Sequence, residues 1–121
     1  MTVSEAIRRA DLTRPNELEP ELKAGWLSAL DGMLRRDVIA ACQGEAPSLQ
    51  QYLLPEEETE LLVPFPDDEL YVFYLLMRID LENGELERYN NDLRLYAQAL
   101  QGWAGAYVRS HRPRGTEQLR F

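Results

Sequence analysis

The residues that could carry out chemistry are concentrated in one polar stretch, NGELERYNND, at positions 83–92. It holds three asparagines, two glutamates, an aspartate and an arginine, and it lies between two of the most apolar segments of the chain. Amides and carboxylates can bind a ligand, but two adjacent asparagines supply neither a nucleophile nor a proton donor of adjustable pKa. We therefore predict that this stretch is the elbow between two helices and not a catalytic site.

The elbow has a predicted internal structure. Asn83 and Gly84 lie where a helix should end, because glycine readily takes the left-handed conformation that closes a helix. Tyr89 then begins the apolar seam of the next helix. Two long apolar patterns separated by so few residues are typical of an antiparallel helix hairpin.

Folding the chain back at Gly84 brings Arg88 opposite Asp80 and Asn90 opposite Arg78. Asn90 and Asp92 then flank the apolar seam. We predict that Asn90 is partly buried and hydrogen-bonded across the hairpin, with ligand binding as the less favoured alternative.

The other candidate groups form no motif of a known chemistry. His111 is the only histidine and lies in the basic C-terminal segment, so no serine or cysteine has a sheltered base. Cys42 follows two alanines on an apolar face and is expected to be a small buried residue. The acidic run Glu56–Glu60 lacks the Asp/Asn/Gly pattern of calcium loops and is interpreted as solvated. We predict no catalytic residue, no metal site, no cofactor and no enzymatic activity.

Composition favours one small globular domain with a separate tail. The chain has 121 residues, of which 45% are hydrophobic, and no apolar run approaches the roughly 20 residues of a membrane span. The N-terminus does not have the pattern of a signal peptide, and a single cysteine fits a reducing compartment. Residues 1–108 carry 9 basic and 20 acidic side chains, whereas residues 109–121 carry 4 and 1. We predict a helical domain over 1–108 and a basic, flexible tail over 109–121.

The elements that must position these residues are about four helices, so the predicted fold class is an all-α bundle. Helices are expected over residues 3–10, from about 16–20 to 43, from Asp67 or Asp68 to the elbow, and from Leu86 to about Tyr107. The third should be central, because LYVFYLLM is apolar on every side. Prolines make residues 44–66 an irregular loop, held to the core by Leu61, Leu62 and Val63.

Two of these helices have a predicted buried face, and their four glycines, Gly25, Gly32, Gly102 and Gly105, are expected to let another backbone approach closely. The second helix should bury Leu22, Trp26, Leu27, Leu30, Met33, Leu34, Val38 and Ala41. The fourth should bury Leu86, Tyr89, Leu93, Tyr96, Leu100, Trp103 and Tyr107, which alternate by three and four positions.

The stretch ELLVPFPDDELYVFYLLMRIDLENGELERYNNDLRLYAQAL, at 60–100, resembles small proteins from the structural-gene region of tailed bacteriophages and prophages. The segment AIRRADLTRPNELEPELKAGWLSALDG, at 6–32, is similar to the opening of such proteins. The group is that of the head–tail connector, or head-completion adaptor, of siphophages. A departure is the lack of a clearly marked loop for plugging the channel, for which residues 43–63 are the only candidate.

The resemblance implies a non-enzymatic virion protein, made in the bacterial cytoplasm. It implies helical subunits that form a ring, commonly of about twelve copies, below the portal. That ring would extend the DNA channel without reading sequence, and it would dock the tail-completion proteins. A C-terminal segment would reach the portal or a neighbouring subunit, here through Arg109, Arg112, Arg114 and Phe121.

In such a ring the exposed charges should sort into complementary flanks, with Glu17 and Glu19 on one side and Arg35 and Arg36 on the other. An acidic lumen would repel phosphates and let the duplex slide. The alternative is a helical interaction or regulatory module outside any virion, which dimerises through the seam between Leu86 and Tyr107.

Overall fold

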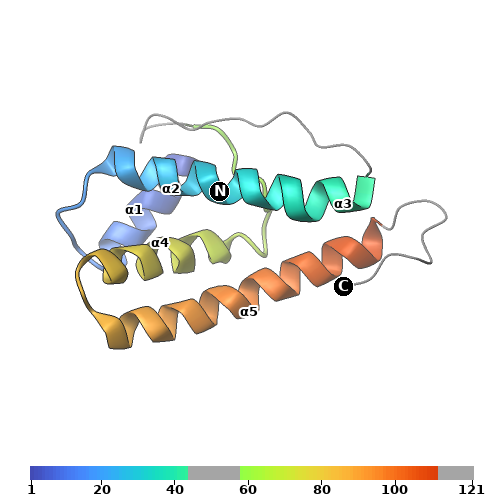
Figure 1. Cartoon of the computed structure of the whole chain (residues 1–121). Helices are drawn as coiled ribbons and strands as arrows, with labels where there is room; N and C mark the ends of the chain where they lie inside the picture. The colour runs from blue at the N-terminus through green and yellow to red at the C-terminus, as the bar shows by residue number, and fades with distance from the viewer. Residues whose placement is uncertain (44–57, 112–121) are drawn as a thin grey trace.

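The computed structural model describes residues 1–43 and 58–111, which form an all-α bundle (Figure 1). The described residues contain no strand, although an isolated antiparallel bridge joins Thr2 to Glu60. The predicted fold class is confirmed. The elements are α1 (Val3–Thr13), α2 (Pro20–Leu34), the π-helical turn η1 (Arg35–Ile39), α3 (Ala40–Gln43), α4 (Glu69–Glu82) and α5 (Leu86–Ser110).

α1 begins where its sequence predicts and ends later. Thr2 is the N-cap, and its hydroxyl oxygen accepts a hydrogen bond from the backbone N–H of Glu5 at 3.2 Å. This bond satisfies one of the amides that a helix start leaves unpaired. The helix continues to Thr13 because the Arg14 N–H still donates to the Ala10 carbonyl, at 2.9 Å. Its buried residues are the four with helical spacing, Val3, Ala6, Ile7 and Ala10.

α2, η1 and α3 follow one another without a break and form a single helical rod (Figure 1). The rod begins at Pro20, where the missing N–H of proline costs nothing, and reaches Gln43 as predicted. At η1 the wider π turn takes up one extra residue, and a helix advances by about 100° per residue. Ile39 and Cys42 are therefore buried, whereas the predicted stripe is wrong at Ala41, which is exposed.

The buried face of α2 is narrower than predicted. Trp26, Leu27, Leu30 and Leu34 are buried, but Leu22 and Met33 are 43% and 37% exposed. Lys23 and Asp31 occupy buried positions in this helix, because each of them has a polar partner on another element.

α4 is the central helix, as its uninterrupted apolar run predicts. Eight of its residues are buried: Leu70, Tyr71, Val72, Leu75, Leu76, Met77, Ile79 and Asp80. Asp68 stands at the predicted N-cap, but its side chain makes no capping hydrogen bond. The carboxylate instead accepts a hydrogen bond from the α-amino group of Met1, at 3.4 Å.

The predicted hairpin is confirmed, and Gly84 is its hinge. Gly84 has φ of 72°, in the left-handed region, and Asn83 is the C-cap of α4. The Glu85 N–H donates to the Asp80 carbonyl at 2.9 Å, which closes the turn. α5 then runs back beside α4 and continues past the start of that helix (Figure 1).

In the first two turns of α5, the side that faces the bundle differs from the predicted apolar seam. Leu86 and Leu93, expected inside, are exposed, and Asp92 is buried beside Leu93. Further along, Tyr96 and Trp103 are buried as predicted, and the Tyr96 ring packs on Tyr74 of α4 with 5.2 Å between centroids. The helix turns toward Asp92 because this carboxylate pairs with the partly buried Arg14, the C-cap of α1.

The described end of the proline-rich segment lies along the N-terminus. The Leu61 N–H donates to the Met1 carbonyl at 2.9 Å, and the Val3 N–H donates to Thr59 at 3.3 Å. Leu61 and Val63 are buried, which confirms the predicted apolar anchor. Most of the predicted irregular loop, residues 44–57, lies outside the described residues.

Within the described residues, no other backbone approaches the helical glycines, so the predicted close approach is not made inside this chain. Apart from the helix itself, a Cβ added at Gly25, Gly32 or Gly102 would have no neighbouring atom within 4 Å, and at Gly105 it would meet only the Arg109 side chain. These glycines lie on open surfaces in the described fold.

The hinge can be tested by replacing Gly84 with alanine. Only glycine takes a positive φ without strain, so Gly84→Ala should lower the free energy of unfolding by about 1 kcal/mol. Gly102→Ala is the matched control: in an open helical position it should raise stability by roughly 0.5–1 kcal/mol. Urea unfolding followed by circular dichroism measures both changes. Equal effects of the two substitutions would contradict the assigned role of Gly84.

Candidate functional site

The most buried charged cluster of the described residues joins three helices at the hairpin end of the bundle. Arg14, the C-cap of α1, donates through Nη1 to Asp80 Oδ2 at 2.5 Å and to Asp92 Oδ2 at 2.6 Å. Asp80 lies in the last turn of α4 and is 0% exposed, while Asp92, in the second turn of α5, is 4% exposed. A single guanidinium thus fixes the start of α5 against both α4 and α1.

Burial is the main reason why the pKa of Asp80 is raised, to about 7. The neighbouring Asp92 carboxyl group raises this pKa further, whereas the positive charges of Arg14 and Arg88 lower it. Asp80 Oδ1 is buried and has no hydrogen-bond partner in the described part of the chain. Two carboxylates of this kind can hold a proton between them. Asp80 itself has no exposed surface, and the cluster joins α1, α4 and α5 in the interior of the bundle.

This cluster replaces the predicted tie through Asn90. Asn90 is exposed, so the prediction that it is partly buried is wrong. The prediction that Arg88 faces Asp80 agrees with its effect on the pKa of Asp80. Arg14 could not be recognised as a site residue from its surroundings, because LTRPN, at residues 12–16, has the composition of a turn. A helix that ends in an arginine, together with aspartates on both arms of a hairpin, was the available signal.

A second polar cluster orders the connection between α1 and α2. Lys23 Nζ donates to Asp11 Oδ1 at 2.7 Å, although the lysine is only 1% exposed. Asn16 donates to the same oxygen at 3.0 Å and accepts from the Leu18 N–H at 3.0 Å. A buried lysine is tolerated because its charge is paired.

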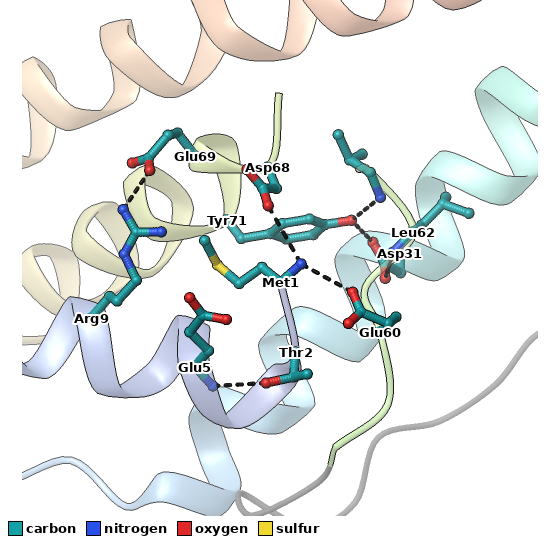
Figure 2. A network of polar contacts seen from close by, with 11 residues as sticks. Met1, Thr2, Glu5, Arg9, Asp31, Glu60, Leu62, Asp68, Glu69 and Tyr71 are labelled. Carbon is teal, nitrogen blue, oxygen red and sulfur yellow. Dashed lines mark hydrogen bonds and ion pairs between the residues drawn. The ribbon is translucent and has the colours of Figure 1, made fainter. Parts of the chain in front are cut away.

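A third network holds residues 58–68 on the bundle (Figure 2). The Tyr71 hydroxyl donates to Asp31 Oδ1 at 2.6 Å and accepts from the Val63 N–H at 2.8 Å. The other oxygen of Asp31 accepts from the Leu62 N–H at 3.0 Å. Asp31 and the Tyr71 hydroxyl that it holds in place therefore each accept from one backbone amide of the segment before α4, and no helix or strand pairs these amides.

The α-amino group of Met1 extends this network by donating to Glu60 at 3.1 Å and to Asp68 at 3.4 Å (Figure 2). Arg9 of α1 pairs with Glu69 at the start of α4. Together these contacts join α1, α2 and α4 to the segment that precedes α4.

The predicted partner contacts are spread over the bundle. Glu17 and Glu19 are exposed before α2, and Arg36 is exposed in η1, where it pairs with Asp37 at 2.7 Å. Arg35 is half-buried, and Arg109 is exposed in the last turn of α5. The described structure does not gather these residues into one site. Arg112, Arg114 and Phe121 lie outside the described residues.

Two open cavities flank the C-terminal half of α5. One, of about 490 Å³, lies between α5 and the segment before α4, and the stacked Tyr107 and His111 rings, 4.0 Å apart, line it with Trp103. The other, of about 450 Å³, lies between α5 and η1. Its lining contains Val38, Ala104 and Val108, with Asp37 and Arg109 as its charged groups. Both cavities suit apolar side chains.

Neither metal ligands nor reactive thiols are brought together in residues 1–43 and 58–111. No cluster of three or more His, Cys, Asp or Glu side chains in these ranges could hold a metal ion. Cys42 is buried as predicted, and its burial raises the pKa of the thiol, which keeps it protonated. Within the same ranges, no helix combines the length and the apolarity that crossing a bilayer requires.

Comparison with protein-family models, with curated proteins and with solved structures finds no match for this chain.

Asp80 should give stability a specific pH dependence. Its pKa of about 7 lies above the value of about 3.9 for an unfolded aspartate, so the folded protein binds an extra proton between these pH values. The stability that Asp80 contributes is complete below about pH 4 and is lost as the pH rises toward 7. Asp80→Asn keeps the shape without the charge, so as the pH rises from about 4 to 7 it should gain stability relative to the wild type, by up to roughly 4 kcal/mol at pH 7.

Thermal unfolding at a series of pH values measures this difference. Glu87→Gln, at an exposed position of the same hairpin, is the control and should follow the wild type. Parallel pH curves for the wild type and Asp80→Asn would contradict the assigned ionisation.

The Asp31 network predicts a large effect from removing one hydroxyl group. Tyr71→Phe leaves the Val63 N–H and one oxygen of Asp31 without this partner in a buried place, so stability should fall by about 2–3 kcal/mol. Tyr89→Phe, on a half-buried tyrosine of α5, is the control and should change stability by less than about 1 kcal/mol. Urea unfolding distinguishes the two, and similar losses would refute the role of the Tyr71 hydroxyl.

Proposed function

We propose that this chain is a non-enzymatic subunit of the head–tail connector of a tailed bacteriophage. In this proposal several copies form a ring under the portal, extend the DNA channel and dock the tail. The observation that carries it is the α4–α5 hairpin, whose residues bear the resemblance to connector proteins. α5 projects beyond α4 at the end opposite the hinge, where the basic segment from Arg109 onward begins (Figure 1).

Rigidity supports this assignment. A ring subunit must keep its shape while it contacts neighbours on two sides. Three polar networks, centred on Arg14, Lys23 and Asp31, join the helices of this small bundle to one another. Each network is largely buried, so water and salt screen its charges less than they screen surface pairs.

The charge distribution also supports it. Residues 1–108 have a balance of 9 basic and 20 acidic side chains, and such a body repels the phosphates of a duplex. A channel that DNA passes through must not hold it, so an acidic wall suits this function. The basic residues of 109–121 would then contact acidic surfaces on the portal or on a neighbouring subunit.

The two cavities along α5 supply places for such contacts. Both are lined mainly by apolar side chains, and both lie at the end of α5 from which the basic segment leaves. A partner could insert apolar side chains there while Arg109 binds one of its carboxylates.

The test is to mix the full chain with a siphophage portal protein and to examine the mixture by electron microscopy. A ring of added density below the portal is the expected result. If neither a ring nor binding is seen, the connector function is wrong and the interaction module outside a virion becomes the better hypothesis.

The C-terminal segment can be tested in the same assay. Ending the chain after His111 preserves α5, so circular dichroism should be unchanged while portal binding weakens by about tenfold or more. Arg112→Glu with Arg114→Glu should have the same effect, and Arg94→Glu, at an exposed position of α5, should not. Unchanged binding by the shortened chain would rule out this segment as the docking element.

A further inference from the structure

One exposed helix face in this strongly charged protein carries no charge over several turns. It consists of Leu22, Gly25, Ala29 and Met33 on α2, which follow one another at intervals of three or four residues, and we call it the α2 face. All four residues are exposed. A helix face in contact with water alone usually carries charged or polar side chains. The α2 face therefore resembles a surface that another helix covers.

The shape of the α2 face suits close packing. Apart from the helix's own backbone and the adjoining residues, no atom lies within 4 Å of the Cβ position at Gly25, and the same is true at Gly32, which lies on the other side of Ala29. Both glycines leave hollows in the helix surface, whereas the Met33 side chain projects from it. In an antiparallel pair of α2 helices that cross at Ala29, Met33 of each copy lies over Gly25 of the other.

The α2 face has opposite charges at its two ends, which favours a second copy of the same helix as its partner. Glu17, Glu19 and Glu21 are exposed at its N-terminal end, and Arg36 is exposed at its C-terminal end. A two-fold axis through Ala29 places the acidic end of each copy beside the basic end of the other. Arg36 pairs with Asp37 in the single chain, but both side chains are largely exposed, so this pair stabilises little and can be exchanged.

We propose that the α2 face is a self-association surface, on which α2 of a second copy of this chain packs antiparallel. The occupant is a second copy because shape and charge are complementary under one rotation. One pair of short helices buries less than the roughly 800 Å² per partner of a standard interface, so the dimer is weak, with Kd near the micromolar range. This proposal is independent of the connector function, because a ring needs a further, head-to-tail contact.

Sedimentation equilibrium of the full chain, from about 1 µM to about 1 mM, tests the contact. The wild type should pass from monomer to dimer over this range. Ala29→Arg places a charge on the two-fold axis and should raise the Kd at least tenfold. Ala97→Arg, at an exposed alanine of α5, is the matched control and should leave the Kd unchanged.

A charge exchange identifies the two-fold geometry. Glu21→Arg alone and Arg36→Glu alone should each raise the Kd by about three- to tenfold, and the double variant should restore it. A wild type that stays monomeric up to about 1 mM would overturn the proposal, as would dimerisation that Ala29→Arg leaves unchanged. The proposal is also overturned if the protein is a monomer and Ala29→Arg lowers its melting temperature more than Ala97→Arg does. In that case the α2 face is covered by another part of the same chain.

Discussion

Asp80 of α4 and Asp92 of α5 face each other at the hairpin end of the bundle, and one guanidinium nitrogen of Arg14 lies between them. Two carboxylates cannot both be ionised at this depth without a cation, because burial and mutual repulsion oppose it. The requirement determines much of the fold. α1 must end where Arg14 reaches the hairpin, and α5 must turn Asp92 inward. Leu93 is displaced toward solvent as a result.

Local patterns in the sequence predicted the helices of this fold and the turn between α4 and α5. The Thr2 cap, the run from Leu70 to Met77 and the hinge at Gly84 each depend on residues that are close together in the chain. The polar interior could not be predicted in this way. Arg14 is 66 residues from Asp80, and Asp31 is 40 residues from Tyr71. A charged residue in a helical pattern is predicted to lie on the surface unless an oppositely charged or hydrogen-bonding partner is known. That partner can be identified only from the tertiary fold.

The need to know tertiary partners also explains why burial in α5 was predicted for the wrong residue. Asn90 and Asp92 both flank the predicted seam, and burial was predicted for Asn90, but Asp92 is the residue that has a partner in Arg14. For the partner residues, the structure gives positions without a common site. Glu17, Glu19 and Arg36 mark the two ends of the α2 face, whereas Arg109 lines the cavity between α5 and η1. The proposed contacts therefore lie on two separate surfaces, the α2 face for a second copy and the C-terminal half of α5 for a different partner.

The π turn at η1 changes the sequence spacing of the buried side of the rod from Pro20 to Gln43. A helix without this turn would continue the spacing of Leu30 and Leu34 to Val38 and Ala41. The additional residue instead places Ile39 and Cys42 on the buried side. One extra residue thus lets a single continuous helix stay in contact with the core along its whole length, although the apolar pattern of its sequence shifts at the turn.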